Sequence, residues 1–81
     1  MKGRRIYPDE DGHLFFAEGD YGRHLNGTWF ARPPGSHAGN LSSHQVTEHE
    51  DGTITVTPSI LITNSDGEWH GYLEGGVWRE V

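Results

Sequence analysis

The sequence contains no cysteine among its 81 residues. This absence excludes disulfides, thiolate-ligated metal sites and cysteine nucleophiles. Leu, Ile, Val and Phe together make up only 16 residues, close to the ~20% level below which chains tend to be disordered. A chain of this length buries only about 63% of the surface that it exposes when unfolded. Because such a small core usually needs further support, we expect self-association into a homo-oligomer.

Long hydrophobic runs are also missing. The longest apolar run is the four residues 14–17, whereas a membrane-spanning helix needs about 20 and a signal peptide at least ~7. The basic start of the chain is followed by Asp9, Glu10 and Asp11, where a signal peptide would be apolar. The sequence therefore predicts a cytosolic protein without a membrane partner.

Positive charge is scarce in the second half of the chain. The net charge is −6; residues 1–40 carry equal numbers of acidic and basic groups, and residues 41–81 carry Arg79 as their one basic group besides histidine. A surface that binds double-stranded nucleic acid should be basic. Binding of double-stranded DNA or RNA is therefore not expected.

Helical periodicity is absent, and twelve glycines and four prolines punctuate the chain. The pattern predicts a single all-β domain over 1–81, built as a small antiparallel meander or a partly open barrel. The clearest element is a hairpin in 44–63, in which Asp51-Gly52 favours a type I′ turn. Pro58 should end or bulge the second strand. Residues 59–63 have apolar side chains on both faces, as in a central strand covered on both sides.

The remaining elements follow from apolar alternation and clusters of turn residues. Strands are expected at 13–18, at 25–31 with an interruption at Asn26-Gly27, at 69–73 and at 77–81, and turns at 64–67 and 74–76. The first dozen residues are expected to be flexible or to lie across a neighbouring subunit.

The polar segment 32–43 is too long for a hairpin turn, and loops of this length are usually functional or disordered. Its arginine, hydroxyls and backbone amides suit an anion, although a linker between an N-terminal hairpin and the meander explains the same residues. Trp69 and Tyr72 are candidates to stack a base, or to pack in the core. The candidate ligand-binding residues are Arg32, Ser36, His37, Asn40, Ser42, Ser43, His44, Trp69, His70 and Tyr72.

Metal binding and catalysis find little support in the sequence. His44, Glu48 and His70 could supply three ligands, but their spacing is not diagnostic of a zinc site, and solvent-exposed strand histidines are the commoner explanation. Ser42 and Ser43 next to His44 do not make a catalytic triad, because adjacency is not triad geometry. We therefore expect no metal, no cofactor and no catalytic residue.

A family resemblance rests on three parts of the sequence: residues 46–60, residues 68–73 and Gly76. An acidic DGTI hairpin, a PSI strand and a WHGYL strand resemble a family of small proteins that are frequent in bacteriophages, especially those of actinobacteria. The resemblance covers about residues 37–81 and implies a phage origin, but it supplies no established activity. More distant relatives carry cysteines that this chain lacks, so a cysteine-based zinc site would be lost here.

The resemblance implies, by analogy with other small phage proteins, a counter-defence protein of the host cytoplasm that binds without turnover. It would sequester a small phosphorylated, nucleotide-type ligand or block a host protein. The phosphate would lie against Arg32, the amides of 35–40 and the neighbouring hydroxyls. The alternatives are a structural or capsid-decorating protein of the virion and a metal-assisted hydrolase that uses His44, Glu48 and His70.

Overall fold

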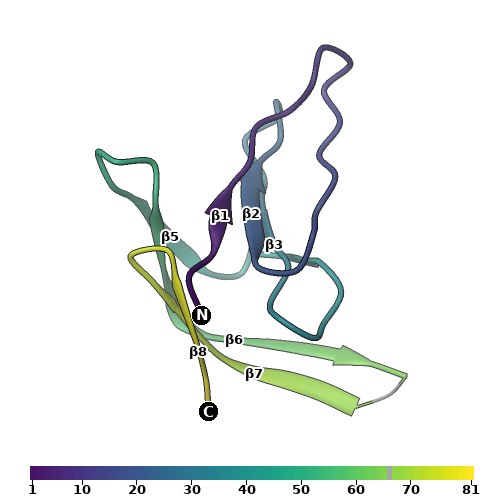
Figure 1. Ribbon diagram of the computed structural model, residues 1–81, viewed down its shortest axis with the longest axis vertical. Coiled ribbons are helices and arrows are strands. Elements are labelled where there is room, and N and C mark those ends of the chain that lie inside the picture. The colour runs from purple at the N-terminus through teal and green to yellow at the C-terminus, as the bar shows by residue number, and fades with distance from the viewer. Residues whose placement is uncertain (66) are drawn as a thin grey trace.

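The computed structural model describes residues 1–65 and 67–81, which form two four-stranded sheets (Figure 1). The first sheet has the order β1 (Arg4–Arg5), β2 (Asp20–Arg23), β3 (Trp29–Ala31) and β4 (Gly39–Asn40). The second has the order β5 (Gln45–Glu48), β6 (Ile54–Asn64), β7 (Gly67–Glu74) and β8 (Val77–Glu80). The all-β fold and the meander of the second half are confirmed, but the sheets do not close into a barrel. Within residues 1–65 and 67–81, no helical segment has the length and apolar character of a membrane span.

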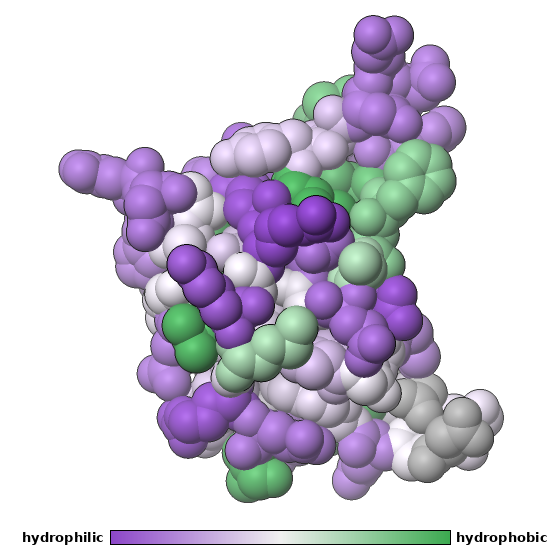
Figure 2. All heavy atoms as spheres, in the orientation of Figure 1, coloured by the Kyte–Doolittle hydropathy of each residue, from purple (hydrophilic) through white to green (hydrophobic). Residues whose placement is uncertain are grey.

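The core lies between the sheets and draws on both. Its buried apolar residues are Tyr21, Ala31, Leu41, Ile54, Val56, Ile60, Ile62, Trp69, Leu73 and Trp78. The rings of Trp69 and Trp78 pack edge to face with their centres 5.4 Å apart, so two large side chains compensate for the small number of aliphatic ones. Figure 2 shows one face of the surface, where hydrophilic residues predominate and apolar residues form small separate patches.

The hairpin of β5 and β6 is confirmed, but the predicted type I′ turn is wrong. That turn needs positive φ at both central residues, and among the described residues only glycines have positive φ. The amide of His49 donates to the carbonyl of Thr53 (2.8 Å) and that of Gly52 to His49 (3.0 Å), which makes a three-residue loop with a glycine bulge. The additional loop residue places Val46 opposite Val56, so that apolar side chains pair on one face.

The strand β6 continues through Pro58, and its pairing with β7 is irregular between Val56 and Ile60. The predicted bulge is therefore confirmed, but the expectation that both faces of 59–63 are covered is wrong. Ile60 and Ile62 are buried, whereas Leu61 between them is 55% exposed. The reason is that this sheet has one face on the core and its other face in solvent.

The final two turns follow the predicted positions. Gly75 and Gly76 join β7 to β8 with φ values of 56° and 78°, which is the pattern of a type I′ turn. Asn64 pairs with Gly67 at the end of the β6–β7 hairpin. Asp66, which belongs to the turn predicted at 64–67, lies outside the described residues.

The strands expected in the N-terminal half are displaced. Residues 13–18 form no strand, and β2 begins at Asp20 instead, because the Asp20 carboxylate accepts the amide of Ala17 at 2.9 Å and holds a turn there. Only the end of 25–31 is a strand, β3, because the chain turns at the predicted interruption, Asn26-Gly27.

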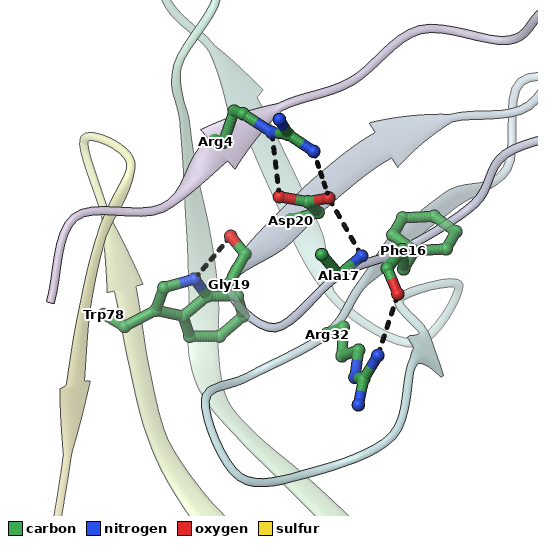
Figure 3. Close-up of polar contacts among 7 residues, drawn as sticks. All are labelled: Arg4, Phe16, Ala17, Gly19, Asp20, Arg32 and Trp78. Atoms are coloured by element: carbon green, nitrogen blue, oxygen red, sulfur yellow. Dashed lines mark hydrogen bonds and ion pairs between the residues drawn. The ribbon is translucent and has the colours of Figure 1, made fainter.

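The first residues of the chain lie against both sheets. The Met1 ammonium donates to the carbonyl of Trp78 (3.1 Å), and the Trp78 amide donates back to Met1 (2.7 Å), where the N-terminus runs beside β8 (Figure 1). Arg4 in β1 binds the buried carboxylate of Asp20 through Nε (3.2 Å) and a terminal nitrogen (2.9 Å), as Figure 3 shows. The indole N–H of Trp78 donates to the carbonyl of Gly19 (2.9 Å) and fastens β8 to the first sheet.

Candidate functional site

The predicted anion loop is occupied by contacts within the chain. Arg32 donates to the carbonyl oxygens of Ser36 and Phe16, both at 2.8 Å, and the second bond is drawn in Figure 3. The amide of Gly35 donates to the carboxylate of Glu18. The cation of this loop and one of its amides therefore stabilise the fold in this conformation.

The other polar groups of the loop also bind the backbone. The buried hydroxyl of Ser36 donates to the carbonyl of His37 (3.2 Å), and the ring of His37 lies 3.1 Å from the carbonyl of Ala38. The side-chain oxygen of Asn40 accepts the amide of Ser42 (2.6 Å). Ser42 and Ser43 themselves are exposed.

The predicted aromatic platform is largely closed. Trp69 is only 5% exposed and packs on Trp78, so its ring has no face open to a base. Tyr72 is half-buried, and the Arg79 guanidinium lies 4.5 Å from the centre of its ring. The structure therefore assigns Trp69 to the core.

Two of the three predicted metal ligands converge on Ser59. Nε2 of His44 lies 3.0 Å from the Ser59 carbonyl oxygen, and Nε2 of His70 lies 2.8 Å from the Ser59 hydroxyl. Glu48 does not join them, because its carboxylate binds Arg5 at 2.8 Å. The structure therefore does not assemble the set of His44, Glu48 and His70.

A different group in the described residues, Asp9, Asp11 and His13, does have side-chain oxygens and nitrogens close enough to share a metal ion. All three are exposed. One oxygen of Asp9 already accepts the amides of Asp11 and His13, both at 2.9 Å. These hydrogen bonds belong to a turn, and the turn accounts for the closeness of the three side chains.

A hollow of about 450 Å³, called here the first hollow, opens beside β1 and the turn between β2 and β3. It is lined by Arg5, Tyr7, Pro8, Arg23, His24, Leu25, Asn26 and Gly27. Its volume lies within the range of about 300–1,000 Å³ that is typical of small-molecule sites. The lining contains two arginines and no carboxylate.

Aromatic rings hold the two arginines in place. The Arg5 guanidinium lies 4.6 Å from the centre of the Tyr7 ring and 4.8 Å from that of Trp29, and Arg23 lies 5.6 Å from Trp29. These contacts are cation–π interactions. One nitrogen of Arg5 also donates to Glu48 (2.8 Å) and to the carbonyl of Gly52 (2.9 Å). The hydrogen bond from Arg5, followed by the charges of Arg5 and Arg23, lowers the pKa of Glu48.

The turn that borders this hollow repeats the turn of the β5–β6 hairpin. The amide of His24 donates to Thr28 and that of Gly27 to His24, both at 2.9 Å, and Gly27 has a φ of 91°. Asn26 accepts the Thr28 amide at 3.0 Å, as Asp51 accepts the Thr53 amide at 3.0 Å. The shared sequence His-x-Asn/Asp-Gly-Thr, at 24–28 and 49–53, is the signal that identifies this turn.

A second hollow of about 370 Å³ lies against the same turn. It is lined by Asn26, Gly27, Thr28, Trp29, Leu41, Ser42, His44 and Val46. Two predicted ligand-binding residues, Ser42 and His44, are therefore brought together here. The sequence does not indicate the arginines of the first hollow, because Arg5 and Arg23 are far apart in the chain and meet around Trp29.

Comparison of this chain with protein-family models, curated protein sequences and solved structures finds no match. The resemblance to small phage proteins, and the function inferred from it, therefore stay predictions.

Proposed function

We propose that this protein is a non-catalytic binding module that takes the phosphate of a small phosphorylated, nucleotide-type ligand in the first hollow. One observation carries the proposal: the lining has two arginines and no carboxylate, in a chain with 12 acidic residues and a net charge of −6. The overall field of such a protein repels anions, so an anion site must gather its cations locally.

Arg23 is the group best placed to contact the phosphate. It is exposed, and no described carboxylate lies within ion-pair distance of it. A guanidinium binds phosphate through two parallel N–H···O bonds. The stack on Trp29 limits the motion of the side chain before the ligand arrives, which lowers the entropy lost on binding.

Other groups of the first hollow support an anion in different ways. Arg5 adds a second positive charge, and the nearby Glu48 adds one negative charge. The net charge of Arg5, Arg23 and Glu48 together is therefore about +1. The side-chain oxygen of Asn26 is used by Thr28, which leaves its NH₂ group to donate. Arg23 takes the role expected for Arg32, because Arg32 donates to two carbonyl oxygens.

The biological role in this proposal is counter-defence in an infected cell, because the resemblance implies a phage origin. Binding alone would suffice, since a protein that holds a nucleotide signal tightly lowers the free concentration of that signal. The fold carries no argument for this role, because the same architecture can serve unrelated functions.

Isothermal titration calorimetry with pyrophosphate tests the proposal. Hydrogen bonds to charged groups contribute about 1.5–3 kcal/mol, so Arg23→Gln should weaken pyrophosphate binding by about ten- to a hundredfold. The control is Arg79→Gln, which removes an exposed arginine paired with Glu74 on the second sheet. No binding to the unaltered protein below millimolar concentration, or equal losses in both variants, would contradict the proposal.

A further inference from the structure

The two hollows meet at one turn. Asn26 and Gly27 line both of them, so the backbone of the β2–β3 turn forms the ridge between the two. A Cβ at Gly27 would meet no atom within 4 Å, and Gly27 is exposed. With no side chain at this point of the ridge, a ligand can pass from one hollow to the other over Gly27.

His44, one of the residues that line the second hollow, has a buried ring nitrogen with no hydrogen-bond partner among the described residues. Nε2 of His44 faces the carbonyl oxygen of Ser59 at 3.0 Å. A carbonyl only accepts, so Nε2 carries the hydrogen and Nδ1 of the neutral ring is an acceptor. Nδ1 is buried, and no described group bonds to it. Because buried polar atoms are nearly always paired, this atom requires a hydroxyl, an N–H group or a water molecule.

The rest of the lining suits a sugar. The hydroxyls of Ser42 and Thr28 can each donate and accept, as sugar hydroxyls require. Trp29, Leu41 and Val46 provide apolar surface against which the C–H groups of a sugar can pack. The lining contains no lysine, arginine, aspartate or glutamate, so it is poorly suited to a second phosphate.

We infer that the ligand of the first hollow is a phosphorylated sugar, free or as part of a nucleotide, whose sugar crosses Gly27 and lies in the second hollow. This inference rests on the proposed function, because Arg23 supplies the phosphate contact. Ser42 and His44 bind the sugar hydroxyls, and their role is specificity for the sugar.

The test compares inorganic phosphate, ribose 5-phosphate and adenosine 5′-monophosphate by calorimetric titration. Ribose 5-phosphate should bind about tenfold more tightly than inorganic phosphate, because two or three hydrogen bonds are added. Ser42→Ala should weaken ribose 5-phosphate about three- to tenfold and leave inorganic phosphate unchanged. The matched control is Ser43→Ala, which removes an exposed hydroxyl that does not line the hollow. Equal melting temperatures would show that both variants are folded.

The outcomes separate the inference from the proposed function. If inorganic phosphate and ribose 5-phosphate bind equally, or Ser42→Ala behaves like Ser43→Ala, the inference is wrong and the proposed function stands. If none of the three compounds binds, both are wrong. Tighter binding of the nucleotide than of ribose 5-phosphate would identify a nucleotide as the source of the sugar, and equal binding a free sugar phosphate.

Discussion

Arg5 and Glu48 form an ion pair that joins the two sheets, with a nitrogen of Arg5 2.8 Å from an oxygen of Glu48. Arg5 belongs to β1 of the first sheet and Glu48 to the end of β5 in the second. The Arg5 side chain is 12% exposed, and that of Glu48 is 43% exposed. Because Arg5 also lines the first hollow, the same pair links the packing of the sheets to the charge available for a ligand.

Glu48→Gln should therefore raise the affinity of the first hollow for pyrophosphate. The substitution removes a negative charge that pairs with Arg5 and also interacts with Arg23, and charges this close interact even in a partly exposed site. We expect a gain of about three- to tenfold at low salt, shrinking as salt screens the interaction. Glu50→Gln, in the nearby exposed turn, is the control. An unchanged or lower affinity in Glu48→Gln would show that Glu48 does not compete with the ligand.

Acid should destabilise the protein partly through Glu48 and Asp51. The hydrogen bond from Arg5 lowers the pKa of Glu48, and the hydrogen bond from the Thr53 hydroxyl lowers that of Asp51. A carboxylate whose pKa is lower in the folded protein stabilises the fold above its ordinary pKa, near 4. This contribution to stability is lost as the pH falls through the pKa that the carboxylate has in the folded protein. Urea unfolding from pH 7 to pH 3 should show a smaller loss in Glu48→Gln than in the unaltered protein, and identical losses would contradict this assignment.

The turn between β5 and β6 gives a prediction that depends on its type. In the observed loop Asp51 has negative φ and accepts bonds from Thr53, so Asp51→Gly should lower the melting temperature by a few degrees. Asp51→Asn should be tolerated, because Asn26 makes the equivalent bond in the other turn. In a type I′ turn, by contrast, glycine at this position would stabilise the hairpin, and a rise in melting temperature would indicate that turn.

Gly52→Val should lower the free energy of unfolding by about 1–2 kcal/mol, because Gly52 has a φ of 88° and a residue with a Cβ is strained there. Thermal unfolding measures the loss. A melting temperature equal to that of the unaltered protein would mean that the chain does not adopt positive φ at this position.

Self-association, expected from the small core, should make the melting temperature rise with protein concentration. Leu61 is 55% exposed on the solvent face of the second sheet, so Leu61→Glu should reduce association without removing a core contact. Sedimentation measures the mass, and a monomer whose melting temperature is independent of concentration would contradict the expectation.

The second sheet could be predicted because its signals are local. Alternating apolar residues, Pro58 and the glycine turns mark its long strands, and each strand pairs with its neighbour in sequence. The first sheet could not, because β1 and β4 have only two residues each and β1 pairs in parallel with β2 across a long connection. No alternation can be read from two residues.

The candidate site was predicted in part for a similar reason. Ser42 and His44 lie in a loop whose composition is distinctive, and the structure places both in the second hollow. Arg5 and Arg23 are ordinary residues in the sequence, and only the stack around Trp29 brings them together. The composition of the loop favours Arg32 as a candidate, but its guanidinium donates to the backbone carbonyls of Ser36 and Phe16.

Mapping of amide chemical shifts during a titration with adenosine 5′-monophosphate tests the central claim most directly. The largest changes should occur in the turn 24–28 and at Arg23 and Arg5, around the first hollow. The amide shifts of Ser42 and His44 should change over the same range of ligand concentrations. Largest changes at 35–40 beside Arg32, or no change at millimolar ligand, would contradict it.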